Sequence, residues 1–529
     1  MRLPDPLQGQ DGSNAKLDSL FINNANISGG NYVGTFCGRA KHAEFSKCAV
    51  DNSTLNGATY VGGLAGSIRN SAAFISRTKN ITITATGEWA GLFVGCNDTT
   101  DRSTLSINNC YAKGKITCAK HGGGFVGESI SQGLYDLSNL ARLYPEVLFV
   151  AIEYREGYMG FMNFEKVPGG EEYKEATNLG LLDQMEALRW IQKNIAGFGG
   201  DPENVTIFGE SAGSASCSFL PLIDGSEGLF KRIIAQSANV AYCDTMEHGM
   251  HVTQNFLDAA GCETMDDLRK LTTEQLLEAI GKGVATDTKN MLGAANFPLL
   301  DGVILPEDRA VMYDMWGDEK RARYDLLIGS NRDEVNYFMA LEGGREPYLE
   351  TLRYIARKDR TFLNDEEKAM FDQFMDTLAE EDEMERLQQY GADLNFRAGN
   401  TNMAIRHSAA GGNTYMYYVE KPGVNELYGV MHGAEMPYLF DNDFCHMGEV
   451  FSPQECEFRH QIKEMWVNFA KTGDPSSAAH EWKQFSGDDR QTMVFSDEIG
   501  MQKDILNRRE DLMMSWAKRL GNGASKRVC

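Results

Sequence analysis

The chain has 529 residues, 42% of them hydrophobic, and a formal net charge of -24. This length allows about two to four domains, and the negative charge argues against nucleic acid or an anionic membrane as a partner. No run of about 18 apolar residues predicts a membrane span. The start MRLPDPLQGQDGS has no apolar core and is not a signal peptide, so it carries no export address.

The charge is divided unevenly along the chain. Residues 1–120 carry 12 Lys and Arg against 8 Asp and Glu, whereas the remaining residues carry 39 against 67. This change in composition predicts a domain boundary near residue 120. We expect residues 1–19 to be disordered, residues 20–120 to form a repeat module, and residues 121–529 to form a second domain.

The first part of the chain contains a glycine-punctuated repeat. The segments YVGTFCG, YVGGLAG, WAGLFVG and HGGGFVG begin at Tyr32, Tyr60, Trp89 and His121, which are 28, 29 and 32 residues apart. Short β-prone runs such as KNITITATG lie between them. A fixed period in this range is typical of stacked supersecondary units, so we expect an all-β, glycine-rich, β-solenoid-like module.

INNCYAKGKIT followed by GGGFVG resembles the GLUG-type repeats of bacterial surface proteins, over about residues 20–127. The resemblance implies a surface-binding module, with surface or carbohydrate contact. A passive scaffold is the alternative. None of the residue types in this segment suggests chemistry.

From Val147 the pattern changes to strands that alternate with helices. The runs VLFVAIEY (147–154), VTIF (205–208), RIIAQS (232–237), YDLLIGS (324–330) and TYMYYVE (414–420) are expected strands, the first of them buried on both faces. The run 178–195 has its apolar residues broadly at helical spacing. This alternation predicts an α/β fold with a largely parallel sheet.

The sequence GESAG, residues 209–213, matches the G-x-S-x-G pattern between a β-branched strand and a small-residue helix start. A nucleophile on a sharp strand-to-helix turn needs small neighbours, and the helix N-terminus that follows places backbone N–H groups near developing negative charge. We therefore predict that Ser211 is the nucleophile of a hydrolase.

A serine nucleophile needs a histidine base that a carboxylate orients, and in this fold the chain order is serine, acid, histidine. His432, flanked by glycine in YGVMHGAEMPYLF, is the best-placed base. His407 and His460 lie in helix-like polar segments and are expected at the surface. Asp333 and Glu334 both follow the strand 324–330, and their spacing does not separate them as the acid.

The region from His121 to Trp516 closely resembles the type-B carboxylesterases, which include the cholinesterases. Blocks in family order carry the resemblance: HGGGFVGES, EYREGYMGF, the long block ending in GESAG, GLFKRIIAQSA, FPLLDGVILP, GSNRDEVNYF, GVMHGAEMPYLF and MWVNFAKTGDP. The resemblance implies an α/β-hydrolase fold and ester hydrolysis through an acyl-enzyme, with a small-molecule ester as substrate.

The resemblance also implies residue roles. The acid is Glu334, the base is His432, and the oxyanion is met by backbone N–H groups of Gly123, Gly124 and Ala212. Glu210 and Ser237 match positions that support the triad, although AQSA replaces the usual QSG and Val335 replaces a usual glycine. FPLLDG is expected to shape the pocket. The implied chemistry needs no metal and no organic cofactor.

Family members carry roughly a hundred residues before the HGGG loop, and here the repeat stands in their place. The expected fold is therefore an α/β-hydrolase that lacks the family's N-terminal strands, with an exposed sheet edge. The alternative function is a surface-associated adhesion protein with an inactive esterase domain. Cys243 with Cys262, and Cys445 with Cys456, bracket loops that would suit disulfides, against buried free thiols as the alternative.

Overall fold

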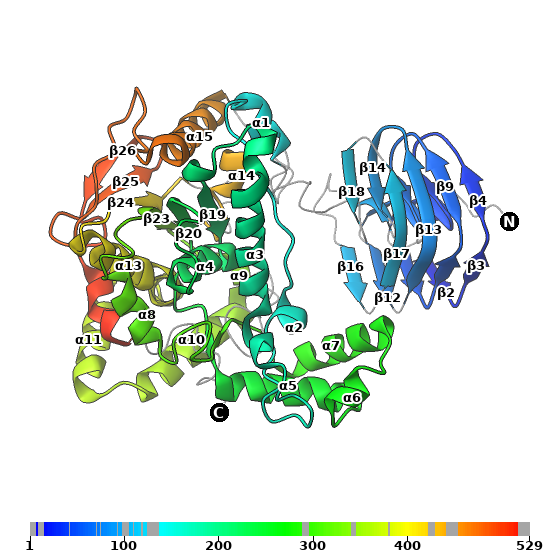
Figure 1. Cartoon of the computed structure of the whole chain (residues 1–529), viewed down its shortest axis with the longest axis horizontal. Helices are drawn as coiled ribbons and strands as arrows, with labels where there is room; N and C mark the ends of the chain where they lie inside the picture. The colour runs from blue at the N-terminus through cyan, green and yellow to red at the C-terminus, as the bar shows by residue number, and fades with distance from the viewer. Residues whose placement is uncertain are drawn as a thin grey trace. The chain divides into compact units, whose positions relative to one another are not determined.

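The structure is a computed structural model, shown in Figure 1. It describes residues 7–8, 15–41, 43–69, 71–74, 76–91, 94–97, 105–108, 111–117, 120–123, 137–287, 296–339, 345–378, 381–421, 429–440 and 453–516. The chain divides into two compact units, described separately below. The first comprises Met1–Ala151, Thr272–Gly281 and Phe440–Glu455, and the second comprises Ile152–Leu271, Lys282–Leu439 and Cys456–Cys529.

The glycine segments of the repeat form one parallel ladder in the first unit. Its strands are β5 (Val33–Gly34), β10 (Val61–Gly62), β14 (Glu88–Gly91) and β18 (Lys120–Gly123). Gly123 pairs in register with Gly91, and Gly91 pairs with Gly62. The backbone of HGG therefore continues the repeat as its fourth strand, in the phase that the spacing predicts.

Three further parallel sheets accompany this ladder. The first contains β1 (Leu7–Gln8), β6 (Cys37–Lys41), β11 (Ala65–Arg69) and β15 (Val94–Asn97); the second contains β2 (Ala15–Asp18), β7 (Ala43–Ser46), β12 (Ser71–Phe74) and β16 (Leu105–Asn108). The third contains β3 (Phe21–Asn23), β8 (Ala49–Asp51), β13 (Arg77–Ala85), β9 (Thr54–Gly57), β4 (Asn26–Ser28) and β17 (Tyr111–Thr117).

Equivalent residues of successive repeats lie above one another in this unit. Asn80 donates to Asn52, and Asn52 donates to Asn23, through side-chain amides at 2.9 Å. The rings of Tyr32 and Tyr60 are stacked with centroids 4.7 Å apart. Because these contacts join residues 28 or 29 positions apart, each repeat stabilises its neighbour. Apolar side chains fill the interior, among them Leu17, Phe45, Val50, Leu55 and Ile83.

The second unit is built on a six-stranded sheet (Figure 1). The strands follow in the order β19 (Thr206–Glu210), β20 (Arg232–Gln236), β23 (Asp325–Asn331), β24 (Thr414–Val419), β25 (Gln491–Phe495) and β26 (Ile499–Lys503). Pairing is parallel except between β25 and β26. Four of the predicted strands are confirmed, and the carboxyl ends of β19, β20 and β23 meet at one edge of the sheet.

Helices pack against this sheet around one apolar core. The predicted helix is confirmed as α3 (Leu179–Asn194), whose buried Leu181 and Met185 share a core cluster with Ile233 and Ile328 of the sheet. The other helices of eight or more residues in the described part of this unit are α4 (Ala212–Phe219), α5 (Met246–Ala260), α8 (Arg309–Trp316), α10 (Arg345–Thr361), α11 (Asp365–Asp376), α12 (Glu383–Ala392), α13 (Ala398–Ala409) and α15 (Pro453–Thr472). Residues Thr273–Gly281 of α7 (Thr273–Asp287) belong to the first unit.

The prediction of a buried strand at 147–154 is wrong. This segment belongs to no sheet, and Leu148 and Val150 are 47% and 39% exposed. Among the described residues β19 pairs only with β20, and its Phe208 is 39% exposed. An apolar run is buried only where neighbours cover both of its faces. Within the described residues β19, the strand that leads to Ser211, is therefore an edge strand of this sheet.

Two further expectations concern histidine and cysteine. His460 is exposed as predicted, whereas the prediction for His407 on α13 is wrong: its side chain is fully buried, while its neighbours Arg406 and Ser408 are partly exposed. Thr414 Oγ1 lies 2.7 Å from one ring nitrogen of His407, and the Arg321 carbonyl lies 3.2 Å from the other. Cys243 and Cys262 are buried free thiols, and Cys445 lies outside the described residues.

Burial lowers the pKa of His407 to about 4. Because the neutral ring is favoured in the folded state, this residue stabilises the fold fully above the unfolded pKa of about 6.5. We expect that contribution to be lost as the pH falls from about 6.5 to 4, at about 1.4 kcal/mol per pH unit and about 3 kcal/mol in all. In His407→Gln the free energy of unfolding should depend less steeply on pH than in the wild type, by the uptake of about one proton. Denaturant midpoints of both proteins, measured across this pH range, check the difference. Identical pH slopes in the two proteins would contradict the assignment.

Candidate active site

Ser211 occupies the turn between β19 and α4. Its φ is 57° and its ψ is -120°, a conformation that costs free energy for a residue with a side chain. Gly209 makes the turn possible, because a Cβ there would lie 2.4 Å from the backbone carbon of Gly213. The backbone N–H of Ser211 donates to the Gln236 carbonyl at 2.8 Å. The glycines of GESAG therefore allow the close approach that the sequence predicts.

Ser211, His432 and Glu334 are joined by two hydrogen bonds. Ser211 Oγ lies 2.7 Å from His432 Nε2, and His432 Nδ1 lies 2.6 Å from Glu334 Oε2. The three residues come from the ends of β19 and β23 and from a loop after β24. With Nδ1 protonated, Nε2 is free to accept the serine proton.

The structure separates the two carboxylates that the spacing leaves open. Glu334 is fully buried and faces His432. Asp333 turns the other way, where Oδ2 accepts the Val430 backbone N–H at 2.8 Å and pairs with Arg332. Consecutive residues of a loop project in different directions, so only backbone geometry distinguishes them.

Glu334 Oε1 has its own partners. Ser237 Oγ donates to it at 2.6 Å, and the Asn331 backbone N–H donates to it at 2.6 Å. The replacement of the usual QSG by AQSA therefore leaves the Ser237 contact intact. Val335, in place of the usual glycine, is fully buried beside Glu334. These two donors leave Oε2 for His432.

Glu210 adds a second carboxylate beside the base. Its Oε1 lies 3.2 Å from His432 Nε2. Burial raises the pKa of the Glu210 carboxyl to about 8, against the opposing effect of His432. Burial lowers the pKa of His432, while Glu210, Glu334 and Glu435 raise it, and the net direction is upward. The protonation state of Glu210 therefore bears on that of the base.

The predicted oxyanion donors are described only in part. Ala212 is the first residue of α4 and is exposed, so its backbone N–H belongs to the first helical turn beside Ser211. Gly123 lies in β18 of the first unit, and Gly124 lies outside the described residues. The glycine donors therefore stay a prediction.

Sequence reasoning missed a polar layer around the triad. Glu435, three residues after the base, is fully buried and accepts from Gln236 Nε2 at 3.0 Å and from Asn331 Nδ2 at 2.6 Å. Asn331 Nδ2 also donates to the Met431 carbonyl at 3.0 Å. The signal in the sequence is that Asn331 and Glu435 each lie three residues from a triad member.

FPLLDG anchors a loop through its aspartate. Asp301 Oδ1 accepts backbone N–H groups of three residues, Val303, Ile304 and Leu305, at 2.8 to 3.0 Å. Its Oδ2 accepts from Thr177 Oγ1 at 2.7 Å and from Asn178 Nδ2 at 2.9 Å. The block therefore joins this loop to the start of α3.

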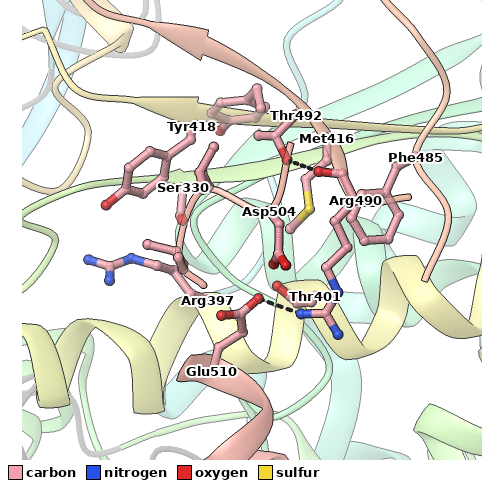
Figure 2. Close-up of a pocket in the computed structure, with 13 residues that line it drawn as sticks. Ser330, Arg397, Thr401, Met416, Tyr418, Phe485, Arg490, Thr492, Asp504 and Glu510 are labelled. Atoms are coloured by element: carbon pink, nitrogen blue, oxygen red, sulfur yellow. Dashed lines mark hydrogen bonds and ion pairs between the residues drawn. The ribbon is translucent and has the colours of Figure 1, made fainter. Parts of the chain in front are cut away.

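A small cavity lies elsewhere in the second unit (Figure 2). Its volume is about 30 Å³ and its lining includes Arg397, Arg490, Asp504 and Glu510. Arg490 pairs with Glu510 at 2.8 Å. A volume of this size holds about two water molecules. No triad residue lines it, so it is not the space where an ester would react.

Across the described ranges, no cluster of three or more His, Cys, Asp or Glu side chains is arranged to hold a metal ion. No helix within those ranges is both long and apolar enough to cross a membrane.

In this unit a serine lies on the sharp turn after one strand of a parallel sheet, and a histidine and a carboxylate follow the carboxyl ends of other strands. This arrangement defines an α/β-hydrolase fold. The chain belongs to the carboxylesterase family, which it matches over residues 116–513. It is a carboxylesterase, as the resemblance implies. Residues 1–115 lie outside the match.

Known relatives agree with this assignment. The chain is 30% identical over 401 residues to the para-nitrobenzyl esterase of Bacillus subtilis (strain 168), covering 73% of this chain and 76% of that protein. It is 27% identical over 411 residues to an acetylcholinesterase of Leptinotarsa decemlineata, covering 72% and 64%. The solved structure of a Geobacillus stearothermophilus carboxylesterase at pH 6.2 has a TM-score of 0.63 at 28% identity, covering 73% of this chain and 79% of that chain.

Proposed function

We propose that the chain hydrolyses small carboxylic esters through an acyl-enzyme on Ser211. His432 takes the serine proton as Oγ attacks the ester carbonyl, and it then returns that proton to the leaving alcohol. Glu334 orients the imidazole and stabilises its cationic form. Water repeats the attack with His432 again as base, which releases the acid. The continuous hydrogen-bonded line from Ser211 Oγ to Glu334 supports this proposal most directly.

The oxyanion of the tetrahedral intermediate needs backbone donors. The Ala212 N–H, at the N-terminus of α4, is one candidate, and the partial positive charge of a helix N-terminus favours an anion there. The family resemblance implies Gly123 and Gly124 as the other donors, and that part of the site stays a prediction. Each such donor typically contributes about 3 kcal/mol to transition-state stabilisation.

The charges around the triad favour neutral esters. Glu334 and Glu435 are fully buried near His432, and Glu210 is half-buried beside it. An anionic acyl or alcohol group at Ser211 would lie near the Glu334 carboxylate, where repulsion is weakly screened. We therefore propose uncharged esters as the substrate class.

For the first unit we propose a structural role, as a stacked β-repeat scaffold of the GLUG type. The support is the ladder of equivalent residues, in which Asn23, Asn52 and Asn80 bond to one another. Carbohydrate contact through this surface stays a prediction.

Covalent labelling tests the proposed nucleophile without the natural substrate. A fluorophosphonate probe should modify the full-length protein on the peptide that contains Ser211, because the probe reports a serine activated by a base. Mass spectrometry of the digest locates the label. Prior heat denaturation should abolish it. Absence of label, or label on a different serine, would refute the assignment of Ser211.

A further inference from the structure

The loops that carry Glu334 and His432 meet at Asn331, the last residue of β23. We propose that Asn331 is a positioning residue that holds these two loops in register for the reaction. It contacts neither Ser211 nor the expected substrate carbonyl, so it would act through the acid and the base. This inference rests on the triad proposed above.

Three hydrogen bonds carry the proposal. The backbone N–H of Asn331 donates to Glu334 Oε1 at 2.6 Å. Its carboxamide donates to the Met431 carbonyl at 3.0 Å and to Glu435 Oε2 at 2.6 Å. Met431 directly precedes His432, and Glu435 follows it by three residues. Asn331 therefore contacts the acid through its backbone N–H and both sides of the base through its side chain.

The orientation of the carboxamide follows from its neighbours. A carbonyl oxygen and a carboxylate oxygen can only accept, so the NH₂ group must face them. Asn331 is fully buried, and its Oδ1 meets no donor in the described part of the chain. A buried amide oxygen without a donor is unfavourable. The two hydrogen bonds of the Nδ2 group therefore hold the Asn331 side chain in place. A side chain that only filled space would not need an amide.

Glu435 completes the arrangement. Its Oε1 accepts from Gln236 Nε2 at 3.0 Å and from the Tyr417 hydroxyl at 3.3 Å. Oε2 has Asn331 as its donor. Without Asn331, burial and the nearby Glu334 would drive Glu435 toward its protonated form, because both already raise its pKa. The pair therefore also shapes the charge that His432 experiences.

The test compares Asn331→Ala with Asn413→Ala. Asn413 is a matched control, since its carboxamide also donates to one carboxylate, Asp325, and one carbonyl, Gly473, both at 3.0 Å. It lies just before β24, at the opposite end of the sheet. With a short-chain p-nitrophenyl ester we expect Asn331→Ala to lower kcat about 10- to 100-fold with KM nearly unchanged, because a small misplacement of reacting groups costs about this much. Asn413→Ala should stay within about twofold.

The pH profile separates positioning from loss of stability. The charged groups facing His432 are Glu210 on β19, Glu334 after β23 and Glu435 at the start of α14 (Met436–Phe440). Loss of alignment with Glu334 and protonation of Glu435 both lower the pKa of His432. The acid limb of kcat/KM should therefore move to lower pH in Asn331→Ala. In a variant that is only partly unfolded, the remaining folded molecules are unchanged, so the acid limb of kcat/KM stays at the wild-type pH.

Two more measurements test the role of Asn331: a rescue variant and a proton resonance of His432. The charge-exchanged pair N331D/E435Q restores a donor–acceptor contact between the two side chains and should recover part of the rate lost in N331D, which keeps the shape of asparagine. The downfield proton resonance of His432 Nδ1–H should shift in the Asn331 variants and not in Asn413→Ala. Because this resonance needs no turnover, it decides the inference even if the wild type fails to hydrolyse esters. Indistinguishable behaviour of Asn331→Ala and Asn413→Ala in rate, pH profile and resonance would overturn it.

Discussion

Replacing Ser211 by alanine should lower kcat for a p-nitrophenyl ester by on the order of 10⁵- to 10⁶-fold, with any residual rate due to the remaining polar groups of the site. The physical reason is that Ser211 Oγ is the only group in the hydrogen-bonded line that can form the acyl-enzyme. Removing it leaves His432 without a nucleophile to activate. Steady-state rates on the full-length protein measure the effect.

The matched control for this change is Ser216→Ala. Ser216 lies on the same helix α4, where its hydroxyl accepts from Gln184 Nε2 at 3.1 Å, outside the triad. The Ser216→Ala variant also loses one hydroxyl, and its kcat should stay within about twofold of the wild type. A single hydrogen bond contributes only about 1 kcal/mol to stability, so the variant should stay folded. If Ser211→Ala hydrolysed esters as fast as Ser216→Ala, the proposed mechanism would be wrong.

Glu334→Gln should lower kcat by about 10⁴-fold while the protein stays folded. Two donors, Ser237 Oγ and the Asn331 N–H, face the Oε1 position, so the amide oxygen of a glutamine must occupy it. The NH₂ group then faces His432 Nδ1 and forces the proton onto Nε2. In that tautomer the ring cannot accept the serine proton.

Asp333→Asn is the informative comparison for this prediction. The carboxylate of Asp333 binds the Val430 N–H and Arg332, and no contact joins it to His432 in the described part of the chain. We expect a lower denaturant midpoint and a kcat within about tenfold of wild type. The reverse pattern, with Asp333→Asn inactive and Glu334→Gln active, would transfer the role of the acid to Asp333.

The local geometry of the turn that carries Ser211 could be predicted because it depends on neighbours in sequence. GESAG places glycines where Gly209 and the Gly213 backbone touch, and the β-branched run before it does form β19. The repeat period in the sequence also corresponds to the strand pairing in the first unit. Parallel strands of equal repeats pair residue by residue, so the spacing of the glycine segments predicts that Gly123 lies beside Gly91.

Predictions failed where burial depends on distant partners. The apolar run at 147–154 has the composition of a buried strand, yet it pairs with nothing in the described residues. His407 sits among polar residues and is nevertheless buried, because Thr414 and the Arg321 carbonyl satisfy its ring nitrogens. Hydrophobicity along a segment measures its tendency to be buried, and not the availability of a surface to cover it.

By itself the sequence determined the turn that carries Ser211, the carboxylesterase family and the largely parallel α/β sheet, because each depends on short-range spacing and on residue types that few other structures use. Residue spacing left Asp333 and Glu334 open, and the resemblance implied Glu334 and Ser237; only the tertiary structure shows that Glu334 faces His432, that Ser237 and Asn331 donate to it, and that Glu435 accepts from Asn331. Those contacts join residues 3 to 104 positions apart, and a hydrogen bond is specified by the direction of both partners, which the fold alone provides.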